Sequence, residues 1–232
     1  RCLRRRPHLG SDSDRMVDAA YVFPGQGAQY VGMGKDLYDK SQAAKAIFDS
    51  ASGLLKIDFK KLCFEGPQEE LSSTENSQPA IFITSIAALK AYESSTIYSQ
   101  FRPKFSLGLS LGEYSALVAA GSLKFEDAVK LVWRRGQFME EAAKENPGKM
   151  AAIFELGLEV IKEISVCAGA EIANLNCPGQ VVISGSLEAV DRAIQLAKDK
   201  GARRVVILEV SGPFHSSLMR SASSKLELEL KN

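Results

Sequence analysis

The order of strand-like and helix-like stretches between residues 149 and 210 constrains the fold of this chain more than any other feature. Four short apolar runs are typical of strands, and two longer stretches carry apolar residues at helical spacing. The strands are expected at 150–156, 171–176, 180–185 and 203–210, and the helices at 158–169 and 187–201. This βαββαβ order is that of a ferredoxin-like unit. We therefore expect a subdomain over 149–210, inserted into a larger body.

The larger body, 16–148 together with 211–232, alternates strands with helices. Strands are expected at 19–23, where a Pro-Gly turn follows, and at 104–109, directly before a helix. The expected helices are 41–54, 77–94, 111–120 and 125–144, with an amphipathic helix at the end of the chain. Strands alternating with helices indicate an α/β core with a mainly parallel sheet.

Composition excludes several classes of protein. The 232 residues are 45% hydrophobic and 25% charged, as in ordinary soluble domains, and no apolar run approaches the length of a membrane span. Residues 1–15 hold five arginines and two aspartates, and we interpret them as a disordered leader or an expression scar. Their removal takes +3 from a net charge of +1 and leaves −2, so the body has no basic excess for nucleic acid.

Metal chemistry is also disfavoured by the sequence. The four cysteines (Cys2, Cys63, Cys167 and Cys177) have no zinc-site spacing, and the chain contains only two histidines. We expect no metal and no bound cofactor. In the absence of a secretory signal we expect a cytoplasmic location, or a plastid or mitochondrial matrix if the source is eukaryotic. We also expect a monomer.

Ser110 lies in the sequence Gly-Leu-Ser-Leu-Gly, which fits G-x-S-x-G between an expected strand and an expected helix. Such an elbow exposes the serine hydroxyl, and the next backbone N–H, that of Leu111, is free to donate to a developing oxyanion. A serine N-cap beside a glycine-rich turn explains the same letters equally well. A serine nucleophile also needs a base. His215 is the only imidazole outside the leader, and it is expected at a helix start, where the helix field helps to keep it neutral.

Five segments together resemble malonyl-CoA:acyl-carrier-protein transacylases. They are YVFPGQGAQYVGMG at 21–34, GLSLGEYSALVAAG at 108–121, RRGQFMEEA at 134–142, NLNCPGQVVISG at 174–185 and VSGPFHSSLM at 210–219. The resemblance implies an α/β-hydrolase-like core with a ferredoxin-like subdomain. It also implies transfer of malonyl from malonyl-CoA, through a serine ester, to the phosphopantetheine thiol of acyl carrier protein in fatty acid biosynthesis.

The resemblance assigns roles to particular residues. Ser110 is the nucleophile, His215 the general base and acid, and the backbone N–H groups of Gln26 and Leu111 form the oxyanion hole. Arg135 holds the malonyl carboxylate. Helical spacing independently places Arg135 on the apolar face of its helix and Arg134 on the polar face. A structural ion pair with a nearby acid is the competing explanation for Arg135.

Two departures from the family pattern are visible. Leu109 stands where many relatives have histidine, and family members usually continue for several tens of residues beyond the segment that matches 215–230. We therefore expect a C-terminally truncated core with an exposed sheet edge, and weak stability and activity.

Two other functions are compatible with the same residues. A serine esterase or thioesterase shares the elbow, and Asp191 or Glu209 lies between Ser110 and His215 in the order such enzymes commonly use. A non-catalytic fragment that binds a carrier protein or coenzyme A is the second alternative. Arg135 discriminates, because an esterase for neutral acyl groups needs no carboxylate-binding arginine.

Overall fold

The computed structural model describes residues 19–99, 101 and 103–231, so the expected leader lies outside the described residues. The strands are β1 (Ala19–Phe23), β2 (Pro103–Gly108), β3 (Gly148–Phe154), β4 (Glu171–Cys177), β5 (Gln180–Ser186) and β6 (Arg204–Ile207). The helices are α1 (Lys35–Lys40), α2 (Gln42–Leu55), α3 (Phe59–Glu65), α4 (Gln68–Ser72), α5 (Thr74–Glu93), α6 (Gly112–Ala119), α7 (Phe125–Glu145), α8 (Leu158–Ala168), α9 (Leu187–Asp199) and α10 (Arg220–Leu230).

The first sheet pairs β1 with β2 in parallel, and the register runs to Phe23 opposite Gly108. Within the described residues this sheet has two strands. The parallel pairing agrees with the parallel sheet expected for the larger body, and the antiparallel sheet belongs to the segment expected as a subdomain. The parallel pair brings the loop after β1 next to the loop after β2, because parallel strands end at the same edge of a sheet.

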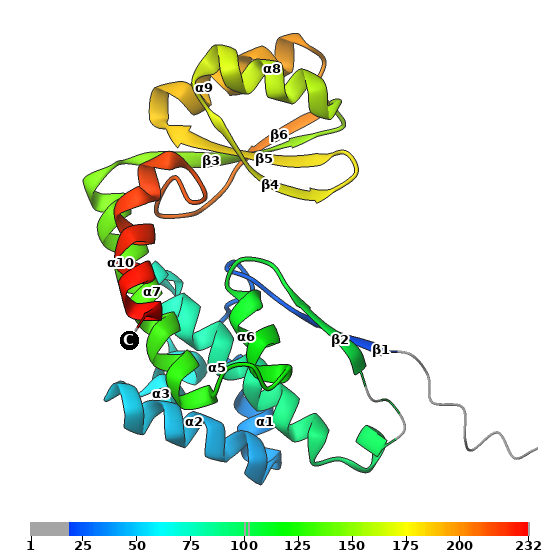
Figure 1. Cartoon of the computed structure of the whole chain (residues 1–232), viewed down its shortest axis with the longest axis vertical. Coiled ribbons are helices and arrows are strands. Elements are labelled where there is room, and N and C mark those ends of the chain that lie inside the picture. The colour runs from blue at the N-terminus through cyan, green and yellow to red at the C-terminus, as the bar shows by residue number, and fades with distance from the viewer. Residues whose placement is uncertain (1–18, 100, 102, 232) are drawn as a thin grey trace, which may run out of the picture.

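The second sheet has the order β4-β5-β3-β6, with every pair antiparallel. Helices α8 and α9 cover one face, as seen in the upper part of Figure 1. That face is closed by a cluster of small and branched apolar side chains, among them Ile153, Ile161, Ile183 and Val190. The amphipathic character of α9, which buries only alanines and Val190, follows from its helical spacing of apolar residues.

A separate apolar core lies between α5, the other helices of the N-terminal part and the first sheet, and includes Phe48, Phe82 and Val129. A third cluster joins the two parts of the molecule. It combines Phe138 and Met139 of α7 with Met150 of β3, and with Phe214 in the loop after β6. Helix α10 lies alongside α7 (Figure 1). The loop that carries His215 is therefore packed between the four-stranded sheet and α7.

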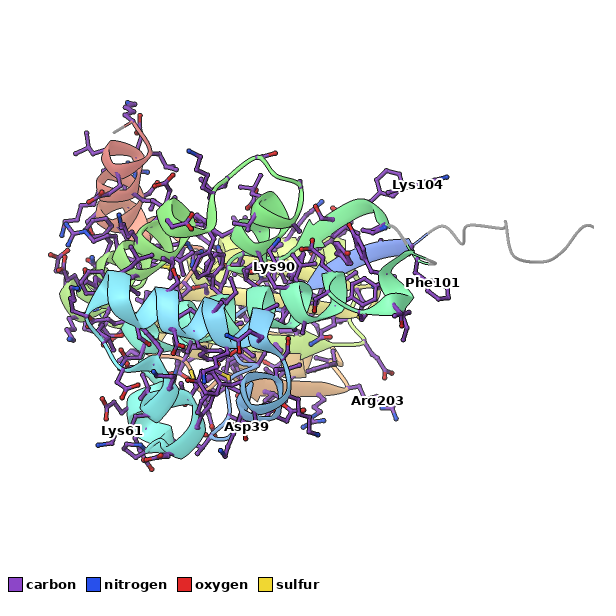
Figure 2. The ribbon with its side chains drawn as sticks, turned by 90° about the horizontal axis from the view of Figure 1, so that it is seen from below. Asp39, Lys61, Lys90, Phe101, Lys104 and Arg203 are labelled. Atoms are coloured by element: carbon purple, nitrogen blue, oxygen red, sulfur yellow. The ribbon has the colours of Figure 1, made fainter. Side chains whose placement is uncertain are left out.

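One face of the first sheet remains open. Phe105, Leu107 and Leu109 alternate along β2 and its end with exposed fractions of 68%, 55% and 56%, and Val22 of β1, opposite Leu107, is 75% exposed. Figure 2 shows Phe101 and Lys104 at the outer end of this strand pair, away from α10. None of the helices among the described residues is both long and apolar enough to span a membrane.

Candidate active site

The strand-to-helix elbow at Ser110 has the expected geometry. Ser110 adopts φ 54°, a left-handed conformation that is uncommon for residues other than glycine. A side chain at Gly108 would overlap the backbone of Gly112, and one at Gly112 would overlap the carbonyl of Phe23. The two glycines therefore permit the close approach of β2, α6 and the end of β1 that forces Ser110 outward.

Two backbone donors lie beside this serine. Within the part of the chain that the structure describes, the N–H groups of Gln26 and Leu111 donate to no other protein atom. The Gln26 loop lies close to the elbow, because a Cβ at Gly25 would be 3.0 Å from the carbonyl oxygen of Leu109. Unpartnered N–H groups next to an exposed serine hydroxyl are an arrangement that can stabilise an oxyanion.

Arg135 lies on α7 with 9% of its surface exposed, whereas Arg134 is exposed and pairs with Glu229 at 3.1 Å. The Arg135 guanidinium donates from Nη2 to Ser110 Oγ at 3.0 Å. Among the described residues no carboxylate forms an ion pair with it within 4.0 Å, although the charge of Glu113 acts on it at longer range. Burial lowers the pKa of Arg135, yet guanidinium stays protonated near neutral pH.

Two neighbours of Arg135 were missed by sequence reasoning. Gln78 of α5 is fully buried and accepts from Arg135 Nη1 at 2.5 Å, and the ring centre of Tyr114 lies 5.6 Å from the guanidinium carbon. Gln78 is a polar residue in a mainly apolar helical stretch, and this pattern is a signal for a buried hydrogen-bond partner. Tyr114 follows Ser110 by one helical turn, which is a weaker signal.

His215 lies in a turn with φ 59°, two residues before the short 3-10 helix Ser217–Met219. It therefore lies just before the N-cap Ser216 of a helical segment that continues into α10, close to the helix start that was expected. The pKa of His215 is lowered, mainly because burial penalises the imidazolium, and also because the positive charge of Arg135 repels it. Both causes favour the neutral imidazole that a general base requires.

The His215 turn is held by contacts on both sides. Ser216 Oγ donates to the carbonyl oxygen of Pro213 at 2.6 Å. Glu171 of β4 accepts from Ser217 at 2.8 Å (backbone N) and 2.6 Å (Oγ). Pro213 leaves no room for a side chain at Gly148 on β3. The four-stranded sheet thus positions the turn that carries the imidazole.

Ser110 and His215 meet in one cavity of about 120 Å³, which Gln26 and Phe214 also line. His215 and Arg135 line an adjoining cavity of about 410 Å³ between α7 and α10. The described residues contain no hydrogen bond between His215 and Ser110. The structure therefore brings Ser110, His215, Gln26, Leu111 and Arg135 to one place, with the serine hydroxyl held by the arginine.

The acids that an esterase would need lie elsewhere. Asp191 is on α9, 62% exposed at its side chain, and pairs with Lys149 at 2.6 Å. Glu209 is exposed. In the described ranges no carboxylate bonds to His215 or shifts its pKa. The same ranges contain no group of three or more potential metal ligands, and Cys63 is buried while Cys167 and Cys177 are exposed.

Residues 20–232 match the model of the acyl transferase domain family. The malonyl CoA-acyl carrier protein transacylase of Bacillus subtilis is 50% identical over 217 residues, which are 91% of this chain and 67% of the relative. A transacylase structure of the same name from Clostridium perfringens superposes with a TM-score of 0.86 at 44% identity, over 93% of this chain and 68% of that one. A malonyl-transacylase in complex with its type II PKS acyl-carrier protein gives a TM-score of 0.85 at 40% identity, over 93% and 70%.

The chain spans about two thirds of the length of these relatives. The match includes every segment that carries a candidate site residue, from the Gln26 loop to the His215 turn. Sequence identity of this extent, together with the superposition, leaves no ambiguity about ancestry: the chain belongs to the acyl transferase domain family and, within it, to the malonyl CoA-acyl carrier protein transacylases.

Proposed function

We propose that this chain transfers a malonyl group from malonyl-CoA to acyl carrier protein in fatty acid synthesis, with Ser110 as the nucleophile. The observation that carries the proposal is the buried guanidinium of Arg135, which lies 3.0 Å from Ser110 Oγ and has no carboxylate partner among the described residues. A buried cation needs an anionic partner, and a planar guanidinium binds a carboxylate through two parallel hydrogen bonds. The free carboxylate of malonyl supplies that partner.

In the first half-reaction Ser110 Oγ attacks the thioester carbonyl carbon while His215 accepts the hydroxyl proton. The carbonyl oxygen becomes an oxyanion, which accepts from the backbone N–H groups of Gln26 and Leu111. The carbon–sulfur bond then breaks, and His215 gives the proton to the departing thiolate, which leaves as the thiol of coenzyme A. The malonyl group is left as an ester on Ser110.

In the second half-reaction the phosphopantetheine thiol of the carrier protein attacks the ester carbonyl carbon. His215 accepts the thiol proton, and the same two N–H groups stabilise the oxyanion. Ser110 Oγ departs and recovers a proton from His215. No water is consumed, and no cofactor besides the carrier's own phosphopantetheine takes part.

Arg135 also has a role before substrate arrives. Its donation to Ser110 Oγ stabilises negative charge on that oxygen, which favours ionisation of the hydroxyl. When malonyl binds, the carboxylate competes for the same guanidinium. Gln78, which accepts from the other guanidinium nitrogen at 2.5 Å, keeps the group oriented while this exchange takes place.

The alternative of a serine esterase is less well supported. His215 has no acidic partner among the described residues, and Arg135 is a charge that a neutral acyl group would leave unpaired.

We also infer a hydrolase-like core of 16–148 with 211–232 and a ferredoxin-like subdomain of 149–210, consistent with the strand order β4-β5-β3-β6. Acyl carrier protein and a coenzyme A thioester are the partners, and a cytoplasmic location stays a prediction.

The proposal is tested by intact-protein mass spectrometry after brief mixing with malonyl-CoA. We expect a malonyl adduct on the parent chain and none on Ser110→Ala. Arg135→Ala is expected to lose malonyl loading by about 100-fold or more while acetyl loading from acetyl-CoA falls much less, because acetyl has no carboxylate.

Arg134→Ala is the matched control, since it removes the neighbouring guanidinium on the exposed face of the same helix. Its malonyl loading is expected to stay within about twofold of the parent value. Release of free malonate without an adduct would favour the hydrolase, and equal loss of malonyl and acetyl loading in Arg135→Ala would refute the carboxylate role.

A further inference from the structure

A chain of four polar side chains lies beside the site and has no part in the chemistry described above. Gln26 Nε2 donates to Thr74 Oγ1 at 3.5 Å, and the hydroxyls of Thr74 and Ser211 lie 2.5 Å apart. Ser211 Oγ donates to Glu140 Oε2 at 3.5 Å, and the backbone N–H of Thr74 donates to the same carboxylate oxygen at 3.3 Å. The Glu140 carboxylate thus accepts one hydrogen bond from Thr74 and one from Ser211.

The chemistry of the groups gives this chain one direction. An amide nitrogen only donates and an ionised carboxylate only accepts, so the two hydroxyls between them must each accept from one side and donate to the other. Gln26 donates to Thr74, Thr74 donates to Ser211, and Ser211 donates to Glu140. Chains of this kind strengthen each member, because every donor is polarised by the next acceptor.

The four residues come from segments that each carry a proposed functional group. Gln26 belongs to the loop whose backbone N–H lines the oxyanion site, and Ser211 precedes the base His215 by four residues. Glu140 lies on α7 with Arg135. Thr74, the first residue of α5, is fully buried at the point where these segments meet.

The packing around Thr74 is tight. A Cβ at Gly136, the residue after Arg135, would lie 2.9 Å from the Thr74 carbonyl oxygen. Helix α7 therefore approaches the start of α5 backbone to backbone. A change in the position of Thr74 is transmitted directly to the helix that carries the arginine, as well as to both loops.

We infer that Thr74 is a positioning residue, whose hydroxyl fixes the oxyanion loop relative to the base turn. The inference rests on the proposed function for its catalytic consequence. Thr74 is fully buried, so loss of its hydroxyl is expected to leave substrate binding intact and to misalign the groups that act in the transition state. The expected signature is a lower kcat with little change in KM.

The experiment compares Thr74→Val, which keeps the shape and removes the hydroxyl, with Thr74→Ser, which keeps the hydroxyl. In Thr74→Val, kcat for malonyl transfer is expected to fall about 10- to 100-fold, the range for small misplacements at a reacting centre. Thr74→Ser is expected to recover most of the parent rate. Ser211→Ala is expected to resemble Thr74→Val, and the double variant to add little, because both break the same chain.

Thr84→Val is the matched control. Thr84 lies on the same helix and its buried hydroxyl has no partner among the described residues, so the identical substitution there removes no hydrogen bond. We expect its kcat to equal that of the parent. An equal loss in Thr84→Val and Thr74→Val, or a loss carried by KM alone, would overturn the positioning role.

A second readout does not depend on activity. Hydrogen exchange followed by mass spectrometry is expected to be faster in Thr74→Val than in the parent for two separate segments, the loop around Gln26 and the segment 208–216. The same segments are expected to be unchanged in Thr84→Val. Unchanged exchange of both segments in Thr74→Val would refute the inference. If exchange is faster in Thr74→Val but the parent chain does not load malonyl, the link stands and the proposed function is refuted instead.

Discussion

At the scale of single residues, Ser110 and His215 share an uncommon backbone conformation, with φ values of 54° and 59°. Left-handed conformations in residues with a side chain cost about 1–3 kcal/mol each, so the surrounding contacts must enforce them. For Ser110 the enforcing contacts are the glycine approaches of the elbow. For His215 they are the close packing of Pro213 against Gly148 and the hydrogen bond from Ser216 Oγ to the Pro213 carbonyl.

The lowered pKa of His215 predicts the pH dependence of loading. Burial and the Arg135 charge both disfavour the imidazolium, so its pKa lies below the ordinary 6.5 and the base stays neutral to lower pH. As pH falls through that lowered value, the base is protonated and loading is lost. We expect the acid limb of the rate profile to have its midpoint below pH 6.5.

The same shift can be measured without activity, because the chain has only two histidines. An NMR titration of the imidazole carbons, assigned with His8→Gln, is expected to give His215 a midpoint below 6.5. In Arg135→Gln the repelling charge is gone, so the midpoint is expected to rise while burial keeps it below the ordinary value. A midpoint that does not move in Arg135→Gln would contradict the electrostatic cause.

Helical spacing was sufficient to distinguish Arg135 from Arg134, because α7 is a long helix with one apolar face and the phase of each residue is unambiguous. The same method could not find Gln78. Helix α5 is buried on nearly all sides, so spacing gives no phase there and the partner of Gln78 depends on tertiary contact. The left-handed turn at His215, just before the expected helix start, could not be predicted for a similar reason, since it depends on contacts with distant strands.

At the scale of elements, the strand-to-helix elbow depends on two glycines that are separated by three residues. The backbone of Gly112 occupies the space that a side chain at Gly108 would need, so β2 and α6 could not meet with any other residue there. The motif was readable in the sequence because the requirement is local. Helices α1, α3 and α4 were not predicted, because segments of 5 to 7 residues hold too few apolar positions to reveal a period.

Gly108→Ala is expected to lower the free energy of unfolding by about 3 kcal/mol, because the added methyl group overlaps backbone that cannot move aside. Gly53→Ala is the matched control. Gly53 lies within α2 with open space around it, and the same change there is expected to raise the free energy of unfolding by about 0.5–1 kcal/mol. Urea unfolding followed by circular dichroism measures both, and equal midpoints for the two variants would contradict the argument.

Strand limits were predicted less well than strand existence. The run 203–210 was expected to be one strand, but β6 covers only Arg204–Ile207. It pairs with β3 alone, over four residues, and lies at the edge of its sheet. The remaining residues instead begin the approach to the His215 turn, where Leu208 and Val210 line the small cavity. Apolar residues in a cavity wall cannot be distinguished from strand residues by composition.

At the scale of the whole molecule, the first sheet exposes a face of large apolar side chains. Val22, Phe105, Leu107 and Leu109 form one apolar row next to open strand edges. Such a surface favours association with other chains. The expectation of a monomer from the sequence took no account of this face, because which side of β2 is covered depends on tertiary structure.

We therefore expect the average mass in light scattering to rise above 25.2 kDa as concentration increases. The double variant Phe105→Thr with Leu107→Thr is expected to reduce that rise, because threonine suits a strand and removes much of the apolar surface. Val166→Thr is the control, since Val166 is 84% exposed but on helix α8, away from this face. A parent chain that keeps one mass at all concentrations would contradict the prediction.

The attachment of the His215 turn to the four-stranded sheet has a mechanical consequence. Glu171 and Gly148 hold the turn from that sheet, while Ser110 belongs to the other sheet and its helix. Ser110 and His215 thus belong to different parts of the molecule, which are joined by the packing of α7 against β3 and Phe214. With the roles that we propose for these two residues, a rotation of one part relative to the other would change the distance between the Ser110 hydroxyl and the His215 imidazole. Such a rotation would therefore change the rate without a contact to either residue.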